Sequence, residues 1–284
     1  MLIGAMNHPA ADPLKEIQWM AEMGLDFVDL TIEPPGAAVW QLNPKAIRDA
    51  LQRHNLPVVG HTAYYLPIGS PFKSLRQATC EELKRCIEAF ALIGAKWMNI
   101  HPDRQQHLHD RDDIIANNIE TFAELLPFAQ NAGVGLMVEN VPVHFNSVEQ
   151  LSELLDPLPD LGLHLDIGHC NLRGTQLGNS YEEIISIYGS RLKHVHLHDN
   201  KGGTADLHLP LGTGTVDLVG CVRALKSINY DDTITLEVFS NDRHYLQYSR
   251  DVLRKVWDDI DELSKHREHE QEHTPAGVGA GRCC

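Results

Sequence analysis

The chain has 284 residues, of which 43% are hydrophobic and 22% charged. These fractions are close to those of globular proteins, so a sizeable core can form and general disorder is not expected. The formal net charge of −15 opposes broad electrostatic attraction to nucleic acid or to an anionic membrane. The chain has no apolar run of the roughly 18 residues that a membrane span needs, and residues 1–7 lack the basic flank of a signal peptide. We therefore expect a cytoplasmic protein without a membrane partner.

Short aliphatic or β-branched runs alternate with longer helical patterns as far as residue 263. Two of the helical patterns, Glu81–Ile93 and Ile115–Ala129, carry an apolar stripe and end at Gly94 and Gly133, where a left-handed cap is favoured. The predicted strands are bounded by Gly, Pro, Asn or Asp. They are Leu2–Met6, Phe27–Ile32, Pro57–His61, Trp97–His101, Gly135–Glu139, Gly162–Asp166, Leu192–His198 and Thr233–Phe239.

Eight strand–helix pairs without a break in composition predict an α/β protein with one (β/α)8 TIM barrel over residues 1–263. The alternative is a doubly wound open sheet, which usually has a glycine-rich turn after its first strand. Residues 7–13 contain no such turn. Residues 264–284 are rich in His, Glu and Gly, and are expected to form a short disordered tail.

Acidic and histidine residues collect at the carboxyl ends of six consecutive predicted strands. These ends meet at one mouth of a barrel, where barrel enzymes carry their active sites. So many carboxylates and imidazoles would repel one another and lose hydration unless cations neutralised them. A divalent-metal site is therefore predicted. Its candidate ligands are His61, His101, Glu139, Asp166, His196 and Glu237, followed closely in the loops by His169, Asp206 and His208.

The type and number of ligands indicate which ions the site would bind. Imidazoles and carboxylates without thiolates favour Zn²⁺, Mn²⁺ or Fe²⁺ over Ca²⁺ or Mg²⁺. A catalytic ion takes about three or four protein ligands, so nine ligands predict roughly two or three ions.

Some histidines allow more than one interpretation. His194, His196 and His198 alternate along one predicted strand and share a face, so any of them could be the ligand, and position favours His196. For His164 the sequence favours neither of two interpretations, a structural role inside the barrel or a functional role at the site. Loop residues near the mouth are candidates for substrate contact. They are His8, His107, His109 and His144, with Tyr64 and Tyr65 as a platform for a sugar or base.

At these residues the sequence resembles the xylose-isomerase-like barrel superfamily, which includes sugar and sugar-phosphate isomerases and epimerases and the endonuclease IV group (AP endonuclease family 2). The resemblance runs across nearly the whole predicted barrel, in short segments with matching order and spacing. They are HisThrAlaTyrTyr at 61–65, AsnIleHisPro at 99–102, ValGluAsn at 138–140, LeuAspIleGlyHis at 165–169, HisLeuHisAspAsn at 196–200, AspLeuHisLeuProLeuGly at 206–212 and LeuGluVal at 236–238.

The two branches of this superfamily imply different metal sites. Resemblance to the isomerases and epimerases implies one ion held by Glu139, Asp166, His196 and Glu237, with the two glutamates also moving protons. Resemblance to endonuclease IV implies three ions. Their ligand sets would be His61, His101 and Glu139; Asp166, His196 and Glu237 with Glu139 bridging; and His169, Asp206 and His208.

Ligands beyond those that a single ion needs favour a multinuclear centre that hydrolyses a phosphate ester, with Glu139 bridging two ions and accepting a proton from water. The acidity of the chain favours a small phosphorylated or sugar-like substrate over nucleic acid. The alternative is a sugar or sugar-phosphate isomerase or epimerase, with one metal ion and with Glu139 and Glu237 as the proton-transferring residues. Other barrel chemistry, such as dehydration, and non-catalytic metal binding are further alternatives. The sequence leaves the substrate, the native metal and the oligomeric state open.

Overall fold

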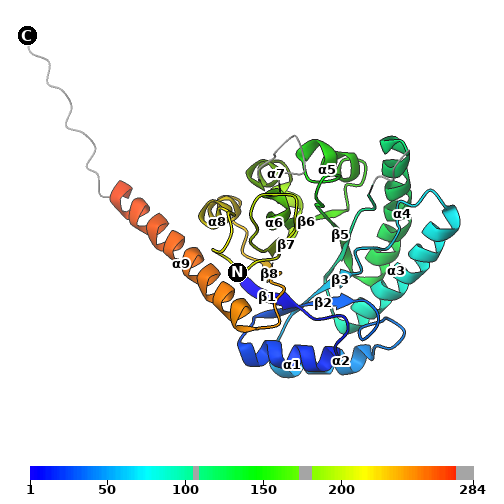
Figure 1. Ribbon diagram of the computed structural model, residues 1–284, viewed down its shortest axis with the longest axis horizontal. Helices are drawn as coiled ribbons and strands as arrows, with labels where there is room; N and C mark the ends of the chain where they lie inside the picture. The colour runs from blue at the N-terminus through cyan, green and yellow to red at the C-terminus, as the bar shows by residue number, and fades with distance from the viewer. Residues whose placement is uncertain (105–108, 173–180, 273–284) are drawn as a thin grey trace, which may run out of the picture.

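The computed structural model describes residues 1–104, 109–172 and 181–272, with side chains as far as Glu262. Eight parallel strands pair in chain order and close into a barrel, and helices surround it (Figure 1). The predicted (β/α)8 barrel is therefore confirmed. The strands are β1 (Leu2–Met6), β2 (Phe27–Ile32), β3 (Val58–Thr62), β4 (Trp97–Ile100), β5 (Gly135–Glu139), β6 (Gly162–Asp166), β7 (Leu192–Leu197) and β8 (Thr233–Leu236).

Half of the strands have the predicted bounds, and the others differ mainly at their carboxyl ends. β3 is shifted by one residue, while β4, β7 and β8 end earlier than predicted. His101, His198 and Glu237 therefore follow directly after strands. Between the ends of β7 and β8, the Glu237 N–H donates a hydrogen bond to the Leu197 carbonyl. Beyond these residues the two segments continue as loops.

The helices lie between the strands, and both predicted apolar stripes fall inside longer helices. Gly94 and Gly133 adopt left-handed φ angles of 105° and 78° at the ends of α3 and α4, as predicted. The helices are α1 (Pro13–Met23), α2 (Pro44–His54), α3 (Lys73–Ile93), α4 (Arg111–Ala132), α5 (Val148–Leu155), α6 (Ile167–Cys170), α7 (Tyr181–Tyr188), η1 (Gly189–Arg191), α8 (Leu218–Ser227) and α9 (His244–Glu272).

The last helix, α9, packs against α8 and β8. Its backbone continues past residue 263, where the sequence placed the start of a disordered tail, and residues 273–284 lie outside the described residues. The division into a barrel domain and a tail stays a prediction. Across the described part of the chain, none of the helices has the length and apolarity needed to cross a membrane.

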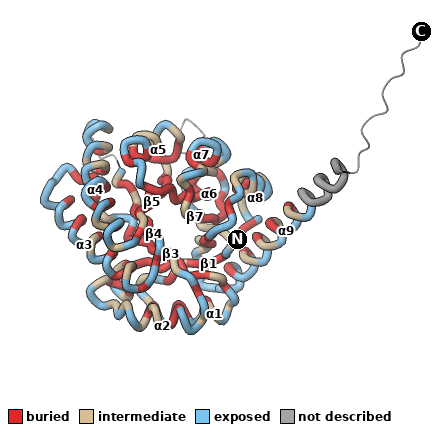
Figure 2. The backbone as a smooth tube through the Cα atoms, turned by 180° about the vertical axis from the view of Figure 1, so that it is seen from behind, coloured by how far each residue is buried: buried red, intermediate tan, exposed pale blue. Residues whose placement is uncertain are grey.

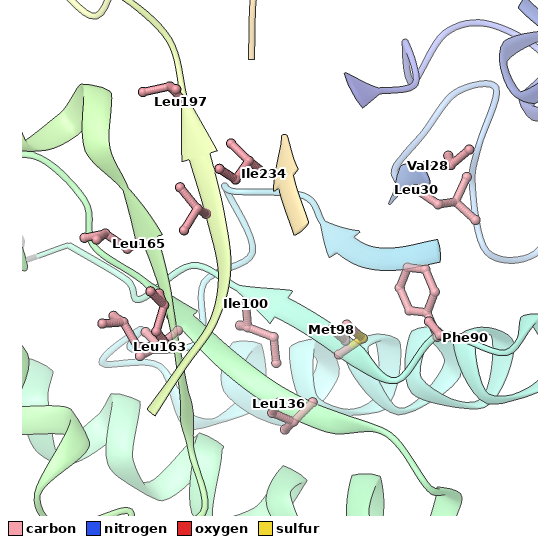
Figure 3. Packing of buried hydrophobic residues seen from close by; sticks show 14 of the residues in the cluster. Val28, Leu30, Phe90, Met98, Ile100, Leu136, Leu163, Leu165, Leu197 and Ile234 are labelled. Carbon is pink, nitrogen blue, oxygen red and sulfur yellow. The ribbon is translucent and has the colours of Figure 1, made fainter. Parts of the chain in front are cut away.

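Outward-facing strand residues form the main core, between the barrel and its helices. Leu163 and Leu165 of β6, Leu197 of β7 and Ile234 of β8 belong to this apolar cluster, together with Phe90 of α3 (Figure 3). The strands and the inner faces of the helices are buried, whereas the outer helix faces are largely exposed (Figure 2). This layer accounts for the short aliphatic runs in the sequence.

Inward-facing residues are apolar only near the start of the strands. Phe27, Val59 and Met137 form a separate small cluster with Trp97 packed against it, and we call these four residues the barrel floor. A side chain at Gly135 would overlap the Trp97 ring, so glycine makes room there for the indole. In these four strands the position two residues further along is polar, and this change marks the beginning of the site. The polar residues are Asp29, His61, Asn99 and Glu139.

Candidate metal centre

The structure brings all nine predicted ligands into one network at the carboxyl ends of the strands. Each of the nine residues has a nitrogen–oxygen contact of 3.9 Å or less with at least one other member, and these contacts link all nine. The pairs are His101–Glu139, His61–Glu139, Glu139–His169, His169–Asp166, His169–Asp206, Asp206–His208, His208–Glu237 and Glu237–His196. The expected clustering is therefore present, and metal binding by these residues stays a prediction.

Glu139, the last residue of β5, is the centre of the first part of the network. Its Oε2 lies 2.9 Å from His101 Nε2 and 3.2 Å from His164 Nδ1, and Asn99 Nδ2 donates a hydrogen bond to it at 2.7 Å. Burial alone would raise the pKa of Glu139, but His101 and His164 outweigh it and hold the pKa well below the ordinary glutamate value. Glu139 is therefore an anion in a buried place.

Asp166, the last residue of β6, is fully buried. Its Oδ1 accepts a hydrogen bond from the backbone N–H of His169 at 2.9 Å, which caps α6. Its Oδ2 has no hydrogen-bond partner within the described residues. Burial opposes ionisation, but His169 and His198 hold the pKa of Asp166 well below the ordinary aspartate value. This oxygen lies 3.6 Å from His169 Nδ1, and a buried anionic oxygen without a hydrogen bond is unfavourable unless a cation is near.

Asp206 comes from the loop after β7 and lies between two imidazoles. His169 Nε2 and His208 Nε2 are 3.1 and 3.2 Å from its Oδ2. Burial opposes ionisation, but the hydrogen bonds from His169 and His208 lower the pKa of Asp206. The pKa of His169 rises to about 10, because Asp166 and Asp206 outweigh the effect of burial. Protons therefore supply positive charge here when no cation is bound.

His196 is held between two carboxylates. Its Nδ1 lies 3.2 Å from Glu237 Oε2 and its Nε2 lies 2.7 Å from Asp29 Oδ2. Burial lowers the pKa of His196, but Glu237 and Asp29 raise it well above the ordinary histidine value. Asp29 is a functional candidate that the sequence analysis missed. The available signal was a charged residue in β2, whose six residues are all buried.

The other two histidines of the alternating set lie on either side of His196. His194 is deeper, with its ring 5.8 Å from that of Phe27 on the barrel floor. His198 is nearer the mouth and lies 3.4 Å from both Asp166 and Asp206. His164, which the sequence left open, is fully buried among the rings of His61, His194 and His196. Burial, together with the neighbouring His196, holds the pKa of His164 well below its ordinary value. The His164 ring is therefore neutral.

The donor set fits divalent cations. Several groups of three ligand atoms lie within 4.8 Å of one another, and they combine imidazole nitrogens with carboxylate oxygens. Within the described residues, Asp166 Oδ2 and the ring nitrogen His198 Nε2 are buried without partners. Such orphaned atoms are rare in folded proteins, and cations would satisfy them. The groups include His61–His101–Glu139, Asp166–His169–His198 and His198–Asp206–His208.

A cavity of about 920 Å³ opens over this network. Asp166 and His196 are fully buried and do not line it. Exposed aromatic rings stand at its rim, where Phe239 stacks on His208 with ring centroids 4.3 Å apart and Tyr64 lies 6.3 Å from the His101 ring. The network residues that line the cavity are His61, His101, Glu139, His169, Asp206, His208 and Glu237.

The loop histidines divide into three cases. His8 lines the cavity, as expected for a substrate-contact candidate. His109 and His144 are not among the residues that line it. His107 lies outside the described residues.

A closed parallel barrel surrounded by helices is a TIM barrel, and here the carboxylate–histidine network lies at the carboxyl ends of the strands, where barrel enzymes carry their active sites. Within that class, residues 17–256 match the model of the xylose isomerase-like TIM barrel, and the chain belongs to that family. The resemblance inferred from the short motifs is therefore confirmed.

Relatives from two branches of this family are similar to the chain. An L-ribulose 3-epimerase of Methylomonas sp. is 25% identical, covering 93% of this chain and 92% of its own. A probable endonuclease 4 of Mycobacterium marinum is 29% identical, covering 79% and 89%. The crystal structure of a D-tagatose 3-epimerase-like protein superposes with a TM-score of 0.82 at 25% identity, covering 93% of this chain and all of that one.

Proposed function

We propose that the protein epimerises or isomerises a ketose sugar or ketose phosphate. The observation that carries this proposal is the pair Glu139 and Glu237, which line one cavity from β5 and from the residue after β8. These strands are not neighbours in the barrel. Two carboxylates on different sides of a bound carbon can remove a proton from one face and return a proton to the other.

The sequence analysis placed phosphoester hydrolysis first and this reaction second. The comparisons support the second reading better, because the epimerase relative covers more of the chain and the superposed structure is titled as epimerase-like. The net charge of −15 also favours a small substrate over DNA.

The proposed reaction needs no redox partner. One glutamate takes the proton from the carbon beside the ketose carbonyl, the C–H bond breaks, and its electron pair forms the C=C bond of an enediolate. The other glutamate, protonated, then donates to the opposite face of the same carbon, and the C=O bond re-forms. Proton return to the neighbouring carbon instead gives isomerisation.

The surroundings of the two glutamates suit this task. Glu139 is held by Asn99 and His101, and Glu237 by His196 and His208. Each carboxylate is thereby fixed before substrate binds, which reduces the reorganisation needed for proton transfer.

A divalent ion would be held by Glu139, Asp166, His196 and Glu237, where it would polarise the carbonyl and neutralise the charge that develops on the enediolate oxygen. The unpartnered Oδ2 of Asp166 is the structural sign that this set fits a cation. The role of the chain is to orient these carboxylates, with one of the two glutamates ionised and the other protonated at the start of the reaction.

The cavity is compatible with a monosaccharide. Its volume of about 920 Å³ is within the usual range of small-molecule sites. Tyr64 and Phe239 are 65% and 63% exposed at its rim. Their ring faces can pack on the C–H face of a sugar while polar groups bind its hydroxyls.

The test is solvent exchange. Protein loaded with Mn²⁺ or Zn²⁺ is incubated in D₂O with ketoses such as D-tagatose, D-fructose and L-ribulose, and deuterium at the carbons beside the carbonyl is measured by NMR. We expect incorporation with at least one ketose, lost in Glu237→Gln and retained in Glu22→Gln, which removes a carboxylate on the outer face of α1. No incorporation with any ketose would remove the proposal.

Phosphoester hydrolysis remains the second candidate. His61, His101, Asp206 and His208 exceed the needs of one ion, yet the structure places all of them in the network. Incision of duplex DNA at an abasic site with Zn²⁺ at low salt, lost in His101→Ala, would establish this activity in place of ketose chemistry.

A further inference from the structure

Three imidazoles converge on the carboxylate of Asp206, although the motif resemblance implies only two. His169 Nε2 and His208 Nε2 lie 3.1 and 3.2 Å from Asp206 Oδ2, and His198 Nε2 lies 3.4 Å from Asp206 Oδ1. His198 is fully buried, and its Nε2 has no hydrogen-bond partner among the described residues. The third nitrogen thus faces Asp206 as the other two do, and it lies at the same distance, 3.4 Å, from Asp166 Oδ1.

All three rings are held in the same tautomer. In each ring Nδ1 faces a backbone carbonyl oxygen, which can only accept a hydrogen bond, so Nδ1 carries the proton. When the ring gives up its second proton, the lone pair is on Nε2, which is the usual arrangement of a metal-binding histidine with an outer hydrogen-bond acceptor. The pairs are His169 with Asn140 at 2.7 Å, His208 with Glu237 at 3.2 Å and His198 with Asp199 at 3.4 Å.

The packing around His198 is consistent with an Nε2 atom that points toward Asp206. Its ring lies 4.2 Å from the His208 ring and 5.8 Å from the His169 ring. A side chain at Gly168 would overlap the His198 ring, so only glycine leaves room for this imidazole at the first turn of α6. The local sequence therefore makes space for a third ring beside Asp206.

We propose that His198 is a ligand of an ion that it shares with His169, Asp206 and His208. His198, Asp206 and His208 present ligand atoms within 4.8 Å of one another, and His169 Nε2 reaches the same Asp206 carboxylate at 3.1 Å. Three imidazoles and one carboxylate are the number and type of ligands that tetrahedral Zn²⁺ takes. This site is separate from the ion discussed for the reaction, and the inference does not depend on the proposed function.

Four protein ligands give this ion a structural role. A closed tetrahedral sphere has no position for an activated water. The ion would instead join α6, the end of β7 and the loop after β7, which supply its ligands. His208, at a left-handed φ of 46°, also donates to the Glu237 carbonyl. The ion would thus fix this loop beside Glu237.

The test uses Co²⁺ as a spectroscopic probe on the full-length, metal-depleted protein. His198→Asn retains an amide near the Nδ1 position but removes the Nε2 donor. We expect the wild-type protein to show the intense visible bands of tetrahedral Co²⁺, and His198→Asn to lose them. Zn²⁺ affinity at this site should fall by more than about 100-fold, beyond the roughly 10–100-fold that outer partners contribute.

One further variant controls the measurement. His54→Asn removes a histidine from the end of α2, and it should leave the spectrum and affinity unchanged. Every variant keeps the C-terminal histidines, so any metal bound there contributes equally. The free energy of unfolding in chelator separates a ligand from a packing residue. Loss of a ligand leaves the stability of the metal-depleted protein unchanged and reduces only the stabilisation that bound metal adds.

Two results would overturn the inference. The first is an unchanged affinity and spectrum in His198→Asn. The second is a weaker affinity with the tetrahedral bands retained, because His198 would then act from outside the coordination sphere. If His198→Asn does not fold, His198→Gln places a carbonyl oxygen near the Nε2 position. A wild-type spectrum in that variant would also reject nitrogen ligation by His198.

Discussion

The barrel interior has two ends with opposite chemistry. At the floor, Phe27, Val59, Met137 and Trp97 pack closely, and glycine makes room for a ring. At the mouth, carboxylates and imidazoles are buried together, and several of their atoms have no hydrogen-bond partner in the described part of the chain. Both ends are built from the same strands, a few residues apart.

This difference shows how one strand can contribute to stability at its start and to function at its end. Close apolar packing at the floor stabilises the barrel, whereas buried charges at the mouth are unfavourable for folding until cations bind. We therefore expect substitutions at the floor to affect folding, and substitutions at the mouth to affect metal and reaction. The following variants test that separation, from the largest expected effect to the smallest.

Glu139→Gln should reduce ketose exchange by about 10³-fold or more, because it removes a proton-transferring carboxylate. The metal-depleted protein should lose only a little stability: the lowered pKa of Glu139 means that its ionised form favours the folded state, but Gln keeps the shape and can still accept the Asn99 hydrogen bond. Exchange is measured by NMR and unfolding by urea titration in chelator. A marked fall in stability would show that the two ends are not separable.

Phe27→Ala should destabilise the protein by about 3–5 kcal/mol, because it leaves a cavity in a fully buried floor. Urea unfolding followed by circular dichroism measures this change. Phe72→Ala is the matched control, because Phe72 is 66% exposed, and it should leave the midpoint nearly unchanged. If Phe27→Ala also removed the bound metal from folded protein, the floor would be part of the site.

Asp29→Asn should weaken Zn²⁺ binding by roughly 10–100-fold, the usual effect of losing a carboxylate that orients a metal-binding histidine. Asp29 lies between floor and mouth and contacts His194 and His196. Competition titration with a chelator measures the affinity. Asp49→Asn makes the same change on the exposed face of α2 and should have no effect on it. An equal affinity in both variants would assign Asp29 to the fold alone.

Leu92→Ala should change stability by no more than about 0.5 kcal/mol, because Leu92 is 58% exposed on α3. Urea unfolding again gives the value. A loss comparable with that of Phe27→Ala would mean that the outer helix faces contribute as much to stability as the floor does.

The barrel and the clustering of the nine residues follow from local patterns. Each strand is marked by a short apolar run with bounding turn residues, and Glu139 and Asp166 stand at predicted strand ends. Parallel strands in a barrel then bring these ends together. The sequence therefore predicts which residues meet, although their role as metal ligands is still to be tested.

The missed features depend on contacts between distant parts of the chain. Asp29 meets His194 across a sequence separation of 165 residues, and nothing near Asp29 in the sequence indicates that partner. The choice among His194, His196 and His198 depends on depth in the barrel, which their alternation leaves open.

The loop after β7 is fixed at its base and exposed at its tip. The Asp199 carboxylate accepts backbone hydrogen bonds from Asn200, Gly214 and Val216, while most of residues 201–205 are exposed. Insertions should therefore be tolerated after Gly203 without moving Asp206 out of the network. An added residue next to Gly214, where a side chain would overlap the backbone of Asn200, should shift the whole loop. The tip is thus a place where the loop can change in length, or where a reporter peptide can be grafted, while its base stays fixed.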